Sequence, residues 1–118
     1  RLSKGSGIDS VVLGMGGDGH TASFFPDASN VRELVTYDSE VQLQTCISQA
    51  SQVARITWSL AALLATDYLV LHITGREKRE LFERATKADK ASMANLMELP
   101  IRSVAYQSRV PLHIYYSD

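Results

Sequence analysis

The stretch Ile8-Asp-Ser-Val-Val-Leu-Gly-Met-Gly-Gly-Asp-Gly-His20 decides the fold. Its first half is a short run rich in valine, isoleucine and leucine, which is typical of a buried strand in a parallel sheet. Its second half holds a glycine cluster that indicates a tight turn: Gly14, Gly16, Gly17 and Gly19. A strand that runs into such a turn predicts an α/β domain whose functional residues follow the strand.

The rest of the chain is predicted to alternate strands with helices. We expect further strands at 41–47, 55–58, 68–73 and 112–116, and helical segments at 21–25, 30–35, 60–65, 76–88 and 100–106. Leu43 and Ile47 alternate with polar residues as in a half-buried strand, and Thr74 and Glu77 have the spacing of a capping box. The pattern predicts one domain over residues 1–118, with a mainly parallel sheet flanked by helices in a Rossmann-like three-layer architecture.

Composition limits the classes of function. The chain has 118 residues, of which 45% are hydrophobic and 21% charged, and this balance excludes a disordered protein. Its net charge of −1 provides no overall field for nucleic acid or an anionic membrane. The longest apolar region, 60–73, is shorter than the ~20 residues of a membrane helix. Cys46 is the only cysteine, which fits a reducing compartment such as the cytoplasm.

The glycine turn offers a site for catalysis. Glycines let the backbone approach a ligand closely, and amides at the start of a following helix can face an anion. A histidine such as His20 can act as a general base at neutral pH, with Asp18 beside it. The spacing matches neither a dinucleotide-binding fingerprint nor a P-loop. From the residues alone, the alternative is a purely structural turn in which Asp18 caps the helix and His20 is merely exposed.

The segment from Leu13 to Pro26 closely resembles a motif of the 6-phosphogluconolactonases, which share a superfamily with the glucosamine-6-phosphate deaminases. Further matches follow in the family's order: Ala54-Arg-Ile-Thr57, Thr74-Gly-Arg-Glu-Lys78, Leu99-Pro100 and the tail Tyr116–Asp118. The resemblance extends from Ile8 to Asp118. Because family members are considerably longer, it implies that this chain is the C-terminal part of such an enzyme, truncated at the N-terminus. The opening segment Arg1–Gly7 leads directly into the first strand and is expected to be a linker, although a processed or engineered terminus would look the same.

The resemblance implies a role for each matching residue. His20 would activate the water that attacks the lactone carbonyl, and Asp18 would orient the imidazole or contact sugar hydroxyls. Arg55 and Lys78 would grip the substrate phosphate, although both could instead be solvated surface charges. The backbone of Gly16, Gly17 and Gly19 would face the substrate. The implied reaction is hydrolysis of 6-phospho-D-glucono-1,5-lactone in the pentose phosphate pathway, by a carboxylic ester hydrolase without a cofactor or metal.

Other functions stay open. A glucosamine-6-phosphate deaminase would carry an acidic residue shortly after the histidine, where this chain has Thr21-Ala-Ser-Phe-Phe25. The chain could also be a non-catalytic sugar-phosphate binding module, because nothing in it corresponds to the family's N-terminal phosphate loop. Alone, it is therefore expected to be a weak or inactive lactonase. A third alternative is a piece of a split or self-associating assembly that pairs through an exposed sheet edge. His72 and His113 are expected to be core or edge residues rather than ligands.

Overall fold

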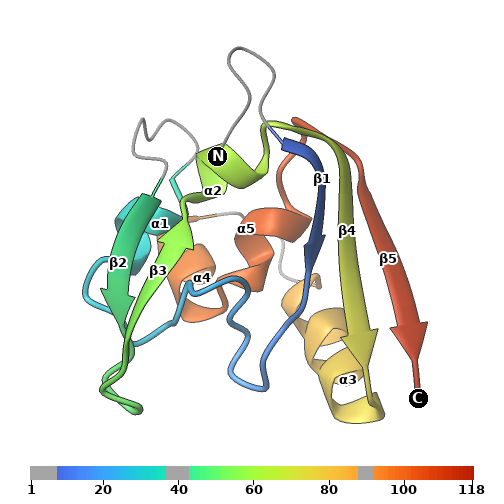
Figure 1. The fold of residues 1–118 in the computed structure, drawn as a ribbon. Helices are drawn as coiled ribbons and strands as arrows, with labels where there is room; N and C mark the ends of the chain where they lie inside the picture. Colours follow the sequence, from blue (N-terminus) through green and yellow to red (C-terminus); the bar gives the residue numbers. More distant parts are fainter. Residues whose placement is uncertain (1–7, 37–42, 88–91) are drawn as a thin grey trace.

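The structure, a computed structural model, describes residues 8–36, 43–87 and 92–118. Val41, Gln42, Ala88 and the segment Arg1–Gly7, which carry expectations from the sequence, lie outside these ranges. Strands alternate with short helices, as Figure 1 shows, which confirms the α/β class. The elements are β1 (Ile8–Leu13), α1 (Val31–Leu34), β2 (Leu43–Ile47), β3 (Ala54–Trp58), α2 (Leu60–Leu63), β4 (Thr66–Thr74), α3 (Arg76–Ala85), α4 (Met93–Glu98), α5 (Ile101–Ala105) and β5 (Leu112–Ser117).

The main sheet is parallel, as predicted, with strand order β1-β4-β5. Its core strand β4 buries Leu69, Leu71 and Ile73 almost completely, because their side chains alternate onto the face that the helices cover. On the opposite face Tyr68 and Tyr115 are exposed and their hydroxyls are 2.9 Å apart. The described residues therefore supply the sheet and one covering layer of the expected three-layer architecture.

The strand β1 forms one edge of the main sheet, since within the described residues it pairs with β4 alone. A groove of about 710 Å³ runs along this edge, between β1 and the β2–β3 hairpin. Val12, Leu43 and Ile56 line it and are all more than half exposed. The edge expected from the sequence is thus present, and self-association through it stays a prediction.

The β2–β3 pair is an antiparallel hairpin beside the main sheet. Its alternation was predicted correctly but its buried face was not, because Leu43 and Ile47 are exposed whereas Cys46 is buried. The physical reason is the contact with the turn after β1: the thiol of Cys46 donates a hydrogen bond to the Ser23 carbonyl at 2.9 Å. Thr57, also buried, accepts one from the Ser23 amide at 3.3 Å. The face of the hairpin that carries Cys46 and Thr57 therefore packs against the segment that follows the glycine turn.

Two local predictions were wrong. Residues 21–25 form turns rather than a helix, because Ala22 has a φ of 51°, outside the helical region. At the start of α3 the N-cap is Gly75, with a φ of 97° and no side-chain cap, so no capping box forms. Thr74 belongs to β4 instead, and its hydroxyl lies 3.1 Å from that of Ser117 on β5.

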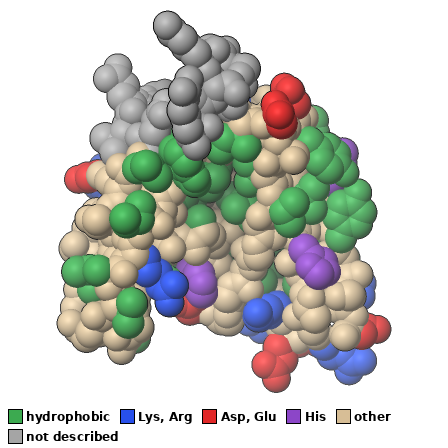
Figure 2. Space-filling view, in the orientation of Figure 1, with side chains coloured by type: hydrophobic (Ala, Val, Ile, Leu, Met, Phe, Trp, Pro, Cys, Tyr) green, Lys and Arg blue, Asp and Glu red, His purple; other side chains and the backbone are tan. Residues whose placement is uncertain are grey.

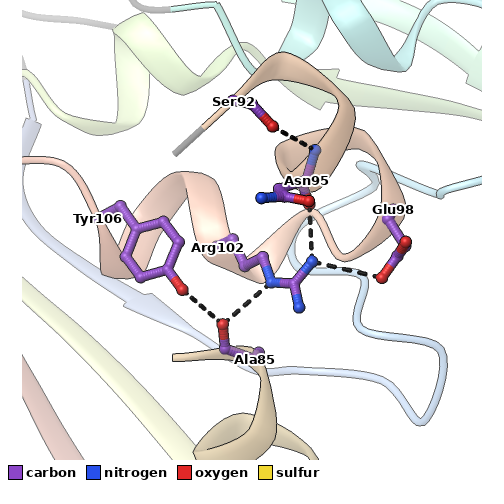
Figure 3. Close-up of polar contacts among 6 residues, drawn as sticks. All are labelled: Ala85, Ser92, Asn95, Glu98, Arg102 and Tyr106. Atoms are coloured by element: carbon purple, nitrogen blue, oxygen red, sulfur yellow. Dashed lines mark hydrogen bonds and ion pairs between the residues drawn. The ribbon is translucent and has the colours of Figure 1, made fainter. Parts of the chain in front are cut away.

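Helices α4 and α5 are held to the end of α3 by the buried side chain of Arg102 (Figure 3). Its guanidinium donates to the carbonyls of Ala85 at 3.0 Å and Asn95 at 3.2 Å, and it pairs with Glu98 at 3.4 Å. The hydroxyl of Tyr106 also donates to Ala85, at 2.6 Å. The carbonyl of Ala85, at the end of α3, thus gains two side-chain donors, whereas the Asn95 carbonyl also accepts from the Leu99 amide at 3.3 Å. No helix in the described ranges is long and apolar enough to cross a membrane.

Candidate active site

The glycine turn follows β1 at the edge where the parallel strands end, which Figure 1 shows near the start of α3. The turn is closed by its own backbone: the Gly16 amide donates to the His20 carbonyl at 2.9 Å, and the Gly19 amide to the Gly16 carbonyl at 3.0 Å. The hydroxyl of Thr21 donates to the Gly14 carbonyl at 2.7 Å. The position of His20 is therefore set by the turn itself.

Two of the glycines are required by the geometry of the turn. A Cβ on Gly16 would lie 2.1 Å from Cε1 and 2.3 Å from Nδ1 of His20, so the imidazole occupies the space that a side chain would need. Gly19 has a φ of 84°, and a Cβ there would lie 2.6 Å from Leu99. Gly17 has nothing within 4 Å of an added Cβ, so any substrate contact it makes would come from its backbone.

Asp18 and His20 form the polar pair of the site. The Asp18 carboxylate accepts from the His20 amide at 3.1 Å and lies 2.5 Å from Nδ1 of the same residue. Burial raises the pKa of Asp18, but the hydrogen bonds from the His20 side chain and backbone outweigh burial and hold it below its ordinary value of 3.8. Because an ionised carboxylate only accepts, we assign the imidazole proton to Nδ1, which leaves Nε2 able to accept a proton.

Lys78 lies in the first turn of α3, a helix that the sequence predicted to begin at Arg76. It shares a pocket of about 400 Å³ with Gly14, Gly16 and His20. Figure 2 shows basic side chains on both sides of a histidine across the hollowed front of the molecule. The pocket thus brings a proton acceptor, an ammonium ion and glycine backbone together.

Arg55 reaches the same region from the hairpin through an aromatic ring. Its Cζ lies 5.8 Å from the centroid of Phe25, and the centroid of the same ring lies 4.6 Å from that of His20. Arg55 is exposed, and its guanidinium forms no ion pair among the described residues. The structure therefore places Arg55, His20 and Lys78 around one end of the sheet rather than on separate faces.

Phe25 is the site residue that sequence reasoning passed over. In the motif it marks only the place where a deaminase would carry an acidic residue. His113 lies on the edge strand β5, as expected, whereas His72 is exposed on the central strand β4 and is therefore neither a core nor an edge residue. Cys46 is buried, and burial raises the pKa of its thiol despite the nearby charge of Arg55. Among the described residues no three histidine, cysteine or acidic side chains gather as metal ligands.

Comparison with known proteins gives consistent matches. The family profile "Glucosamine-6-phosphate isomerases/6-phosphogluconolactonase" matches residues 2–112. A 6-phosphogluconolactonase of Rhizobium meliloti is 37% identical over 116 residues, which are 98% of this chain and 47% of that protein. One of Mesorhizobium japonicum is 34% identical over 110 residues, 93% of this chain and 43% of that protein.

The fold agrees with these matches. The crystal structure of a 6-phosphogluconolactonase from Shewanella baltica superposes with a TM-score of 0.81 at 31% identity, covering 93% of this chain and 44% of that one. This chain thus spans less than half the length of the relatives it matches. Since the profile extends over nearly all of its residues, the chain belongs to the glucosamine-6-phosphate isomerase/6-phosphogluconolactonase family.

Proposed function

We propose that this chain carries the catalytic base and the phosphate anchors for hydrolysis of 6-phospho-D-glucono-1,5-lactone to 6-phosphogluconate. One observation carries the proposal: the His20 imidazole, paired through Nδ1 with Asp18 at 2.5 Å, shares a pocket with Lys78. Relatives named 6-phosphogluconolactonases support the choice of substrate.

The chemistry needs one proton acceptor. Nε2 of His20 takes a proton from water while the water oxygen bonds to the lactone carbonyl carbon. The tetrahedral intermediate then collapses, the bond between that carbon and the ring oxygen breaks, and the imidazolium returns its proton to the ring oxygen. Asp18 holds the imidazole in the required tautomer and stabilises its charged form.

The phosphate is assigned to Lys78 and Arg55. An ammonium ion and a guanidinium both form charge-assisted hydrogen bonds with phosphate oxygens, and Arg55 is exposed and available on β3. Lys78 also lies in the first turn of the ten-residue helix α3, whose amides and dipole favour an anion. Phosphate binding at this end would leave the lactone ring near His20.

Lactone hydrolysis fits the site better than sugar deamination. Opening the ring of an amino sugar needs a further proton-transferring group near the histidine, and here His20 packs against the apolar ring of Phe25. Hydrolysis requires only a base and a stabilised oxyanion.

A second candidate is sugar-phosphate binding without turnover. The Asp18 and His20 side chains are 52% and 30% exposed, whereas electrostatic catalysis depends on a site that excludes water. The chain also spans less than half the length of its relatives. We therefore expect turnover by this chain alone to be weak.

A His20→Ala variant tests the proposal. If His20 is the base, turnover of 6-phosphogluconolactone falls by about 10² to 10⁴-fold while affinity for 6-phosphogluconate is retained. His113→Ala is the matched control, because His113 is an exposed histidine on β5. Binding by both proteins with turnover by neither supports the second candidate, and equal turnover by His20→Ala and the wild type refutes the role of His20.

A further inference from the structure

A single aromatic ring connects the candidate base with a candidate phosphate anchor. The ring of Phe25 packs against the imidazole of His20 with centroids 4.6 Å apart and planes inclined by 39°. The guanidinium carbon of Arg55 lies 5.8 Å from the centroid of the same ring. Three successive contacts thus link Asp18 to Arg55: a polar contact from Asp18 to His20, a ring contact from His20 to Phe25, and a cation–π contact from Phe25 to Arg55.

The backbone fixes where the Phe25 ring lies. Its amide donates to the Ser23 carbonyl at 3.1 Å, and its carbonyl accepts from the Ala28 amide at 3.1 Å. Ser23 is in turn held by both strands of the hairpin, at 2.9 Å by Cys46 and at 3.3 Å by Thr57. Because the hairpin that carries Arg55 also holds the segment that carries Phe25, the ring and the guanidinium are positioned together.

Phe25 also contacts two groups that can both be positively charged. When His20 holds a proton taken from water, its imidazolium and the guanidinium of Arg55 carry the same charge and repel each other. The ring of Phe25 contacts both groups and offers each a favourable interaction. An aliphatic side chain of similar size would fill the space without either ring interaction.

We propose that Phe25 is a positioning residue that fixes the orientation of the His20 imidazole and holds the Arg55 guanidinium at a set distance from it. The inference rests on the proposed function for the roles of these two groups. The packing itself is independent of turnover and can be measured on this chain without a substrate.

The first test uses the ring protons of His20. In Phe25→Leu their NMR resonances should shift strongly, because the ring current of Phe25 is lost, and Phe25→Tyr should retain them close to the wild-type positions. The chain offers an internal control in Tyr68 and His113, whose centroids also lie 4.6 Å apart, with planes inclined by 36°. Tyr68→Leu should shift the resonances of His113 and leave those of His20 unchanged.

The second test is affinity for 6-phosphogluconate and for inorganic phosphate, measured by calorimetry. Loss of the cation–π contact should weaken binding about two- to fivefold in Phe25→Leu, and Phe25→Tyr should restore it. Unchanged His20 resonances in Phe25→Leu, or equal binding by Phe25→Leu and the wild type, would overturn the proposal. If the wild-type chain binds neither ligand, the proposed function fails, and the His20 resonances still decide the role of Phe25.

Discussion

Replacement of Gly16 by alanine should displace the candidate base without unfolding the protein. The added Cβ would lie 2.1 Å from Cε1 of His20, and a normal contact between carbon atoms is about 3.5 Å. The imidazole must therefore move by about 1.4 Å, the difference between these two distances. Its 2.5 Å contact with Asp18 cannot survive such a displacement as a good hydrogen bond.

The expected effect is larger on activity than on stability. A misplacement of about 1 Å lowers an enzymatic rate by roughly 10²-fold, and we expect a loss of that order for Gly16→Ala. The His20 side chain is 30% exposed and can swing outward, so the free energy of unfolding should change by less than about 1 kcal/mol. Turnover of 6-phosphogluconolactone measures the loss of rate, the His20 ring resonances report the displacement of the imidazole, and thermal unfolding measures the change in stability.

The matched control is Gly17→Ala, one residue further along the turn. An added Cβ there meets nothing within 4 Å, and Gly17 has no positive φ, so this variant should keep the wild-type His20 resonances. If Gly16→Ala and Gly17→Ala shift these resonances alike, the steric reasoning is wrong.

Three further substitutions test other parts of the site and fold. Lys78→Ala should weaken binding of 6-phosphogluconate about 10- to 100-fold by calorimetry, because a charge-assisted contact is lost, and Lys87→Ala on the exposed end of the same segment should not. Because the pKa of Asp18 is lowered in the folded state, its stabilising effect is complete above its ordinary value of 3.8 and disappears as the pH falls through the lower folded value. Asp18→Asn should therefore flatten the decline in the melting temperature below pH 3.8, and an unchanged decline would contradict this. Arg102→Ala should lower the free energy of unfolding by about 1–3 kcal/mol in denaturant titrations, whereas Arg84→Ala at an exposed position of α3 should have little effect.

The strands of the main sheet were predictable because local sequence determines them. The apolar runs that form β1 and β4 have few alternatives, and both strands appear within two residues of the predicted limits. Helix α4 was not predicted, because the six residues that follow the Ser92 N-cap are too few to show a strong hydrophobic periodicity. The alternation of apolar and polar residues in β2 indicated a strand. It could not show which face of that strand packs against the rest of the domain, because this depends on Ser23, more than twenty residues earlier.

The candidate site also contains parts that the sequence predicted and parts that it could not predict. The sequence placed Asp18 and His20 together because only one residue separates them. Lys78 and Arg55 were assigned through a resemblance, and the structure brings both to the same end of the sheet. The ring contacts of Phe25 were beyond prediction, because they require the hairpin to lie against the turn and no spacing in the sequence encodes that packing.

The glycine turn is also tied to a distant part of the chain, and this affects when the site can mature during synthesis on the ribosome. The Gly19 carbonyl accepts a hydrogen bond from the Ile101 amide at 2.9 Å, next to the close approach between Gly19 and Leu99. The motif therefore leaves the ribosome well before the residues that hold it in place. A nascent chain from which Leu99 has not yet emerged should expose the turn to proteases, and emergence of Ile101 from the ribosome should protect it.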